Sequence, residues 1–558
     1  MLISNFIQKI QKEYTIVKTI DLNHWLELES FKRSIWLEKQ LTDVYQSSYS
    51  DEQRIVFTLT AQANCTNTVT NNVLLNLQQL LNQIDISNFF VVVLTNNKVD
   101  TDFIQENSTD AIPISIYYVD DSTVEINRAG KKFDYNSVVP NKINLEDLTA
   151  KQQQLLTQSN TFCIYPWIHL HAFPTGESWP CCHSEMKNGP LGTTKENSLK
   201  EIWNSDRMRE LRTDMLNERE NNYCTRCYEQ EAAGFFSGRL SANKHHGHLI
   251  ERVSDTTPDG TYEDFNMTYW DIRFSNLCNL SCRSCGHIFS SSWYKDQVAL
   301  AGETWGKNNK PLNYAGKYST DIWEQLEPHL DYVEQIYFAG GEPLMMEEHY
   351  HILEELERRG RFDVRLVYNT NFTHTKLKDR SVFDYWKKFD SVAVGASLDA
   401  MGLRAEYIRK GTKWNIVEEN RKQMMEICPE VDFYISPTLS IMNALHLPDF
   451  HCDWVERGFI RPQDLNVNIL QDPEYFRIDI AGPELKSQIT EKYQKHLEWL
   501  RPLDKLNRAV VGFESALKFL HASDNSHLQL IFIQRTQQLD RLRKERIQDV
   551  IPELRNMF

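Results

Sequence analysis

Residues 271–287 read DIRFSNLCNLSCRSCGH and contain three closely spaced cysteines, Cys278, Cys282 and Cys285. Cysteine thiolate is the usual ligand of a 4Fe–4S cluster, in which each of four irons takes one ligand from outside the cube. Three cysteines leave one iron open to a small molecule. An open coordination position is typical of a reactive metal site rather than a structural one.

The spacing Cys-x3-Cys-x2-Cys, directly after the extended run Tyr269 to Asn276, resembles that of the radical SAM superfamily. In those enzymes S-adenosylmethionine chelates the fourth iron. The motif Gly340-Gly341-Glu342-Pro343 matches the superfamily's GGEP element. Glycines there let the backbone approach a ligand closely, and the resemblance implies contact with the methionyl amine.

Three later elements also resemble the superfamily, in the expected order. Asn369 and Asn371 belong to a segment similar to its polar TNG motif, and Ser397 and Asp399 to its SxD element, which reaches the ribose. Arg409 falls where the family places an arginine against the methionyl carboxylate, a pairing that suits a bidentate guanidinium.

Two positions near the third cysteine leave alternatives open. The residue before this cysteine is often aromatic in the superfamily and packs near the adenine, but here it is Ser284. His287, Phe289 or a residue on a later strand is a candidate for that packing role. His287 also allows a zinc site with the three cysteines, although zinc prefers paired Cys-x2-Cys or Cys/His units and does not explain the downstream motifs.

The region after residue 265 alternates strand-like and helical patterns. The strand-like runs are Met267–Asn276, Val333–Ala339, Asp363–Thr370, Ser391–Leu398, Val431–Ser440 and Leu465–Leu470. Helical patterns such as His349 to Arg359 and Trp414 to Ile427 separate most of them. This alternation predicts an α/β fold with parallel strands and crossover helices, in the form of a partial (β/α)6 barrel. Ligands are expected at the carboxyl ends of the strands.

A second cysteine set precedes the core. Cys163 and Cys181 are separated by twelve residues, Gly176 and four more residues, and Cys224-x2-Cys227 follows. This pattern resembles the SPASM and twitch auxiliary-cluster domains. The shorter twitch type is the better match, because no further cysteine follows Cys227 until Cys278. The resemblance implies that Cys163, Cys181, Cys224 and Cys227 hold a second 4Fe–4S cluster.

Alternatives remain for this second set. Cys182 can replace Cys181 as a ligand, and a four-cysteine zinc ribbon fits the spacing too. Such a domain usually follows the radical SAM core, whereas here it precedes the core. His169 and His171 alternate nearby and are interpreted as packing or surface residues.

The pattern divides the chain into four regions: an N-terminal α/β domain (1–155), the cysteine-rich auxiliary domain (160–250), the radical SAM core (265–480) and a helical extension (481–558). In the first region, Val73 to Ile84 has helical periodicity between strand-like runs at Arg54–Leu59, Phe89–Leu94 and Ile114–Val119. In the last region, helices are expected at Glu484–Trp499 and Gln534–Val550, with the basic run Arg541 to Arg546 on an exposed face.

Composition excludes several classes of function. The net charge of −16 over 558 residues argues against non-specific nucleic-acid binding. The longest apolar run, Phe89 to Leu94, is far too short to span a membrane, and the first residues show no signal-peptide pattern. Eleven cysteines at these spacings indicate metal ligation in a reducing compartment, so we expect a cytoplasmic protein.

The resemblance implies a radical SAM enzyme. A reduced core cluster cleaves S-adenosylmethionine to a 5′-deoxyadenosyl radical, which abstracts hydrogen from a peptide or small-molecule substrate, and the auxiliary cluster relays electrons or binds substrate. An electron donor such as flavodoxin or ferredoxin is the expected partner. The alternative is a non-catalytic iron–sulfur or zinc-binding interaction protein.

Overall fold

The computed structural model describes residues 142–232 and 236–558, and in residues 1–141 it describes the backbone of five strands. The chain divides into two compact units. The first comprises residues 1–160 and 226–247, and the second comprises residues 161–225 and 248–558.

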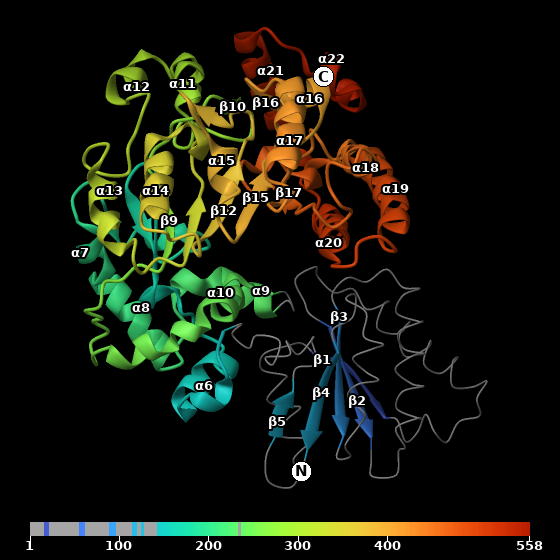
Figure 1. The fold of residues 1–558 in the computed structure, drawn as a ribbon. Coiled ribbons are helices and arrows are strands. Elements are labelled where there is room, and N and C mark those ends of the chain that lie inside the picture. Colours follow the sequence, from blue (N-terminus) through green and yellow to red (C-terminus); the bar gives the residue numbers. More distant parts are fainter. Residues whose placement is uncertain are drawn as a thin grey trace. The chain divides into compact units, whose positions relative to one another are not determined.

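The first unit contains a five-stranded sheet with its strands in chain order (Figure 1). They are β1 (Ile16–Asp21), β2 (Ile55–Ala61), β3 (Phe89–Thr95), β4 (Ile114–Val119) and β5 (Val124–Asn127). The first four pair in parallel and β5 pairs antiparallel with β4. β2, β3 and β4 coincide with predicted runs, whereas the predicted helix Val73 to Ile84 lies outside the described residues.

The second unit is built on an eight-stranded sheet with the order β17-β15-β12-β11-β9-β6-β7-β8. Five strands match predicted core runs: β9 (Tyr269–Ile272), β11 (Gln335–Phe338), β12 (Arg365–Thr370), β15 (Val392–Ala396) and β17 (Asp432–Ile435). Each pairs in parallel with the next one along the chain. The predicted α/β fold with a parallel sheet is therefore confirmed for this unit.

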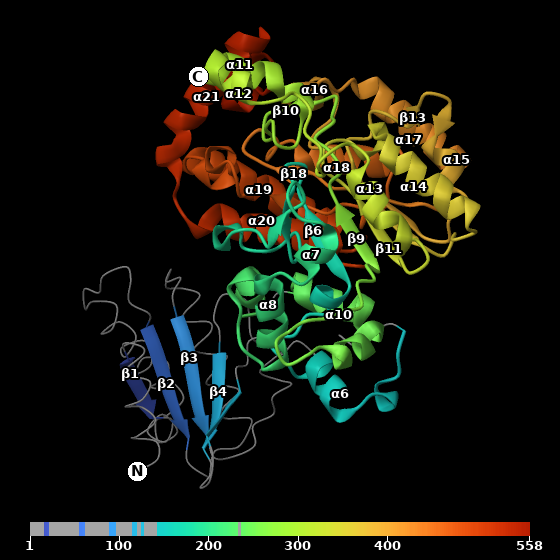
Figure 2. The same cartoon turned by 90° about the vertical axis from the view of Figure 1, so that its left-hand side faces the viewer.

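Crossover helices cover one face of these strands. Figures 1 and 2 show α14 (Glu347–Arg358), α15 (Val382–Trp386) and α17 (Trp414–Ile427) on the same side of the sheet. Successive side chains of a strand point to opposite faces. In β12, Leu366 and Tyr368 are fully buried, whereas Val367 and Asn369 are only half-buried. The sheet therefore has an apolar face under the helices and a second, more polar face.

His349 of α14 lies in this apolar core. Its Nε2 atom lies 3.0 Å from the Tyr368 hydroxyl, and its ring packs edge-on against Phe338. Burial lowers the pKa of His349 to about 3. Because the folded-state pKa lies below the ordinary value, the histidine contributes stability above pH 6.5 that is lost as pH falls.

We therefore expect the His349→Gln variant to depend less on pH than the wild type. Between pH 6 and pH 4 the slope of the unfolding free energy should fall by up to about 1.4 kcal/mol per pH unit. Urea unfolding at several pH values measures this slope. His521→Gln, at an exposed position, is the control, and equal slopes in His349→Gln and wild type would contradict the prediction.

The fifth and sixth predicted strands are shorter than expected. The run Val431–Ser440 breaks into β17 and β18 (Thr438–Leu439), because Pro437 between them has no N–H to donate. The sixth run is reduced to β19 (Asn468–Ile469), which pairs in parallel with β18. A bridge between Ile435 and Leu465 also joins this run to β17.

The cysteine-rich segment contributes to the same sheet. β6 (His169–Ala172) pairs in parallel with β9, and β7 (Glu177–Trp179) and β8 (Gly192–Thr193) continue antiparallel. Helices α7 (Leu199–Trp203), α8 (Asp206–Leu216), α9 (Thr225–Ala232) and α10 (Gly238–His246) follow. The first part of the predicted auxiliary region is thus joined by hydrogen bonds to the strand that leads into the core cysteines.

The C-terminal part is helical, as predicted. After α18 (Leu447–Glu456), which still belongs to the predicted core region, it contains α19 (Pro483–Leu500), α20 (Arg508–Ala522), α21 (Gln529–Arg543) and α22 (Ile547–Val550). The predicted helix Glu484–Trp499 is confirmed by α19. The predicted helix Gln534–Val550 ends early, at Arg543, because Lys544 adopts the left-handed conformation (φ 57°).

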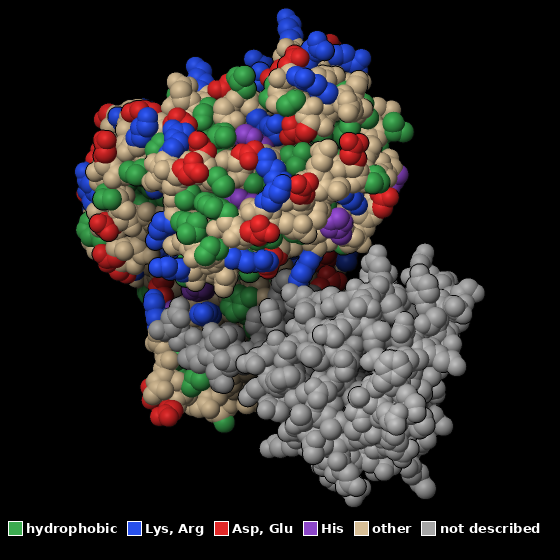
Figure 3. Space-filling model, turned by 90° about the vertical axis from the view of Figure 1, so that its right-hand side faces the viewer, with side chains coloured by type: hydrophobic (Ala, Val, Ile, Leu, Met, Phe, Trp, Pro, Cys, Tyr) green, Lys and Arg blue, Asp and Glu red, His purple; other side chains and the backbone are tan. Residues whose placement is uncertain are grey.

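The surface carries charges of both signs. On the face shown in Figure 3, Lys and Arg side chains are interspersed with Asp and Glu side chains. Among the described residues, no helix combines the length and the apolar character that crossing a membrane requires.

Candidate active site

The core cysteines lie on the loop between β9 and α11 (Tyr294–Ala301), at the carboxyl end of β9. The Cys278 N–H donates to Ser291 Oγ at 3.2 Å, and the Cys285 N–H donates to the Cys282 carbonyl at 3.0 Å. The Trp293 indole also donates to the Cys282 carbonyl, at 2.8 Å. These bonds order the loop around three half-buried thiols.

The chemistry of the three thiols fits a metal cluster. Burial raises the pKa of each thiol, that of Cys285 to about 12, and mutual repulsion between the cysteines adds to the effect for Cys278 and Cys285. The nearby Arg409 guanidinium acts in the opposite direction on Cys282 and Cys285, but the pKa of each thiol stays raised, so thiolates are unfavourable in this loop without a bound metal. A coordinated metal reverses this balance, because a ligating thiol loses its proton outright.

The glycine loop Gly340-Gly341-Glu342-Pro343 follows β11 and packs directly on the cysteine loop. The Glu342 N–H donates to the Leu277 carbonyl at 2.7 Å. Gly341 has φ +49°, and a Cβ there would lie only 2.4 Å from that same carbonyl oxygen. Only glycine permits this approach. The backbone cradle predicted for the methionyl amine therefore lies beside the cysteines.

The carboxylate of Glu342 joins two loops. It is fully buried and accepts hydrogen bonds from Thr370 Oγ1 at 2.6 Å, the Asn371 N–H at 2.7 Å and the Leu344 N–H at 3.1 Å. Burial raises the pKa of Glu342 to about 7, against the effect of these donors. The carboxylate thus links the end of β11 to the end of β12.

The two asparagines of the TNG-like segment have different positions. The Asn371 amide donates to Asn279 Oδ1 at 2.9 Å and lies 3.9 Å from Cys278 Sγ. The Asn369 amide instead donates to the Tyr337 hydroxyl at 2.6 Å, on the polar face of the sheet. Only Asn371 therefore borders the cysteine loop.

Arg409 and Asp399 form a buried pair beside Cys282. Arg409 donates to both carboxylate oxygens, each at 2.8 Å, and its remaining Nη1 lies 3.8 Å from Cys282 Sγ. The pairing of β10 (Ser281–Cys282) with β16 (Arg409–Lys410) fixes this proximity. The sequence predicts that the two residues contact different parts of S-adenosylmethionine, whereas the structure pairs them with each other.

Ser397, the other residue of the SxD element, directly follows β15. Its backbone N–H donates to the Thr370 carbonyl at 2.8 Å.

His287 and Phe289, the named candidates for packing on the adenine, both contact other parts of the protein, and so does His287 as the candidate zinc ligand. His287 Nε2 lies 3.2 Å from the Pro311 carbonyl, and its ring packs edge-on against Trp305. Phe289 is 36 % exposed and contacts Phe173, which follows β6. Within the described parts of the chain, no three His, Cys, Asp or Glu side chains converge closely enough to hold a single metal ion.

Three cysteines of the auxiliary region are close enough to Tyr165 to influence its pKa. Burial and the charges of Cys182, Cys163 and Cys181 raise the pKa of this tyrosine. Cys163 is buried, whereas Cys182 is exposed, with its Sγ 3.6 Å from His183 Nδ1. Cys181 Sγ lies 3.6 Å from Ser184 Oγ.

The other two auxiliary cysteines, Cys224 and Cys227, flank the start of α9. Cys224 ends a short 3-10 helix, and Cys227 is buried within α9, where burial raises its pKa. Cys227 belongs to the first unit, and the other auxiliary cysteines belong to the second. All of them carry the soft sulfur donors that iron–sulfur clusters require.

His171, Asp271 and Arg273 form a buried polar array that the sequence patterns did not predict. His171 Nδ1 lies 2.9 Å from Asp271 Oδ2, and Arg273 donates to Asp271 Oδ1 at 2.9 Å. Although burial opposes the shift, Arg273 and His171 hold the pKa of Asp271 well below its usual range. The Arg273 guanidinium lies 5.4 Å from the centre of the Tyr337 ring. The sequence signal for this array is the pair of charged residues Asp271 and Arg273, which alternate within the predicted strand run Met267–Asn276 before the cysteines.

Comparison with known proteins identifies one domain. Residues 163–228 match the family model of SPASM, described as an iron–sulfur cluster-binding domain. The match covers the cysteines from Cys163 to Cys227 and confirms the predicted iron–sulfur domain. Among curated proteins, none matches the chain.

Three solved structures illustrate the structural likeness. Native anSMEcpe with bound AdoMet and Cp18Cys peptide has 17 % identity, covers 43 % of this chain and 60 % of its own, and has a TM-score of 0.28. Streptococcus suis SuiB bound to precursor peptide SuiA has 13 % identity, 53 % and 63 % coverage, and a TM-score of 0.27. TYW1 with a lysine–pyruvate adduct has 14 % identity, 42 % and 71 % coverage, and a TM-score of 0.21. The chain thus spans about 60 % of the length of the first of these.

Proposed function

We propose that this protein is a radical SAM enzyme with a SPASM domain and that it binds S-adenosylmethionine at a 4Fe–4S cluster on Cys278, Cys282 and Cys285. The observation that carries the proposal is the packing of the Gly340-Gly341 loop on this three-thiolate loop, through the Glu342 N–H and the Leu277 carbonyl. Cys278, Cys282 and Cys285 would hold this cluster, which when bound would supply the electron for reductive cleavage of S-adenosylmethionine.

The residues of the chain bind and orient the cofactor. The backbone of Gly340 and Gly341 would receive the methionyl amine, and Pro343 begins the short 3-10 helix that follows this loop. Asp399 binds Nε and Nη2 of Arg409, and the remaining Nη1, beside Cys282, would be available to bind the methionyl carboxylate. Asn371 borders the same loop, and Ser397 is assigned to the ribose. In this proposal Asp399 acts mainly by holding Arg409.

The proposed architecture is a partial (β/α)6 barrel formed by β9, β11, β12, β15, β17 and the β18–β19 pair. Parallel order and crossover helices support it. The cysteine, glycine and asparagine elements all follow the carboxyl ends of their strands, which is where such barrels bind ligands.

The polar face of the sheet is the proposed substrate surface. Asp271, Arg273, Tyr337 and Asn369 form a connected layer there, through the contacts described above. Gly395 borders this layer. A Cβ on Gly395 would lie only 2.7 Å from Asn369 Oδ1, so glycine leaves room for the Asn369 side chain. Such a layer favours a polar substrate. We propose a peptide or a small polar molecule, in line with the peptides named for anSMEcpe and SuiB.

The second cluster is assigned to Cys163, Cys181, Cys224 and Cys227, with Cys182 as the alternative to Cys181. Four thiolates complete a 4Fe–4S cube, which suits electron relay from an oxidised substrate. The electron that starts each cycle comes from a donor such as flavodoxin or ferredoxin, in a cytoplasmic setting.

Anaerobic reconstitution tests the proposal. The full chain, loaded with iron and sulfide, is incubated with S-adenosylmethionine and a strong reductant, and 5′-deoxyadenosine is quantified. We expect its formation, with about eight irons per chain. Protein that carries iron and sulfide but forms no 5′-deoxyadenosine would support a non-catalytic iron–sulfur protein instead, and zinc without iron would support a zinc-binding one.

A further inference from the structure

The cysteine loop contains a buried positive charge. Arg283 lies between Cys282 and Cys285, and only 3 % of its surface is exposed. A buried guanidinium is costly unless carboxylates and hydrogen-bond acceptors compensate it. Its partners therefore show which part of the chain holds this loop in place.

The partners come from the C-terminal end of the chain. Arg283 Nη2 donates to Asp540 Oδ1 at 2.5 Å and to Glu545 Oε2 at 2.8 Å. Its Nε donates to the Tyr407 carbonyl at 3.1 Å, and the guanidinium lies 3.6 Å from the centre of the Tyr407 ring. Two carboxylates thus reach the cysteine loop from more than 250 residues away along the chain.

Both carboxylates are themselves fixed. Asp540 accepts hydrogen bonds from the Tyr407 hydroxyl and the Ile547 N–H, each at 2.8 Å. Glu545 accepts from Lys410 Nζ at 2.5 Å. Lys410 belongs to β16, the strand that pairs with Ser281 and Cys282. The same two residues therefore brace both the loop and its strand partner.

A second bridge runs parallel to the first. Arg543 donates to Asp296 at 2.7 and 2.9 Å and lies 4.9 Å from the centre of the Trp293 ring. Trp293 in turn donates to the Cys282 carbonyl. The expectation that Arg541 to Arg546 form an exposed face is wrong for Arg543, whose side chain is 4 % exposed. Residues three apart on a helix share a face, so Arg543 points the same way as Asp540.

We propose that Asp540, Arg543 and Glu545 form a C-terminal clasp that positions Cys282 and balances the charge beside the core cluster. The inference rests on the proposed function, because it requires the cluster. Charges in a buried site interact strongly with a reducible centre. Loss of a clasp carboxylate leaves Arg283 less compensated and favours the more negative, reduced cluster. Loss of Arg283 leaves the carboxylates uncompensated and has the opposite effect.

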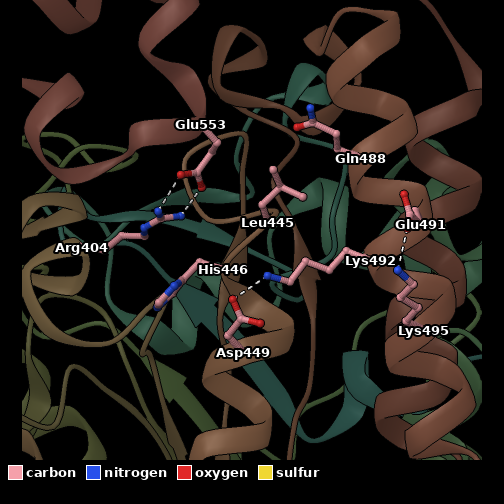
Figure 4. Close-up of a pocket in the computed structure, with 9 residues that line it drawn as sticks. All are labelled: Arg404, Leu445, His446, Asp449, Gln488, Glu491, Lys492, Lys495 and Glu553. Carbon is pink, nitrogen blue, oxygen red and sulfur yellow. Dashed lines mark hydrogen bonds and ion pairs between the residues drawn. The ribbon is translucent and has the colours of Figure 1, made fainter.

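The test compares Glu545→Gln and Arg283→Gln in the reconstituted full chain. The matched control is Glu553→Gln, which also removes a two-oxygen pair between the C-terminal segment and the core, here with Arg404 at 2.5 and 2.9 Å (Figure 4). Reductive titration followed by electron paramagnetic resonance gives the cluster potential, and the signal that changes on addition of S-adenosylmethionine identifies the core cluster.

We expect a more positive core potential in Glu545→Gln, a more negative one in Arg283→Gln, and the wild-type value in Glu553→Gln. Shifts of the same sign in the first two variants, or wild-type potentials in both, would overturn the clasp. If Arg283→Gln does not fold, Arg283→Lys keeps the charge and should retain the wild-type potential, and a large shift there would count against the proposal. Wild-type protein without iron and sulfide would instead contradict the proposed function.

Discussion

Replacement of Cys278, Cys282 and Cys285 together by alanine is expected to reduce the formation of 5′-deoxyadenosine by roughly 1,000-fold or more, to background. The triple variant loses all three thiols that the proposal assigns to the core cluster, so the proposed electron path to S-adenosylmethionine is lost completely. Chromatographic quantification of 5′-deoxyadenosine after reconstitution measures the effect. The iron content should fall to about four per chain, because the auxiliary cysteines are unchanged.

Cys428→Ala is the matched control for this experiment. Cys428 is a buried cysteine at the end of α17, outside both predicted cluster sets. Its replacement should lower stability slightly and leave the iron content and the cleavage unchanged. Cleavage at the wild-type rate in the triple variant would exclude the core assignment.

The auxiliary cysteines should give a different phenotype. In the variant with Cys224 and Cys227 both replaced by alanine, we expect the iron content to drop from about eight to about four while cleavage of S-adenosylmethionine is largely retained. Turnover of the true substrate should be lost, because the proposed acceptor of its electron is absent. Iron analysis and 5′-deoxyadenosine formation without substrate measure the first two effects.

The same assay separates the two adjacent candidates in this set. Cys181→Ala should lower the iron content and Cys182→Ala should not, since Cys182 is the exposed member. The reverse result would assign the ligand to Cys182. An auxiliary variant that folds and keeps all its iron would contradict the second cluster itself.

Much of the core could be predicted because its signals are local. The runs that became β9, β11, β12, β15 and β17 are apolar and bounded by polar turns, and helical periodicity predicts α17 at Trp414–Ile427. The cysteine and glycine motifs are contiguous in sequence, so their residue types and spacing are visible without a structure. Strand length was less predictable, as the shortening of the run Leu465–Leu470 to β19 shows, because pairing partners decide where a strand ends.

Long-range contacts were beyond such reasoning. Nothing near Arg409 in the sequence shows that Asp399 holds two of its nitrogens, and nothing near His171 shows that Asp271 is its partner across a strand pair. The pairing of β6 with β9 joins residues 100 positions apart, as the bond between His171 and Asp271 illustrates. These contacts depend on which surfaces meet after folding.

The sequence by itself predicted the kind of chemistry, from three cysteines on one loop, four of the five cysteines of the auxiliary region as a second ligand set, and glycines where a backbone is expected to approach a ligand. Only the tertiary structure decided how these parts are held. It set the Glu342 carboxylate between two strand ends, paired Arg409 with Asp399 beside Cys282, and buried Arg283 against Asp540 and Glu545. The reason is physical: ligand type is a property of single residues, whereas the compensation of a buried charge depends on groups that only folding brings within hydrogen-bond distance.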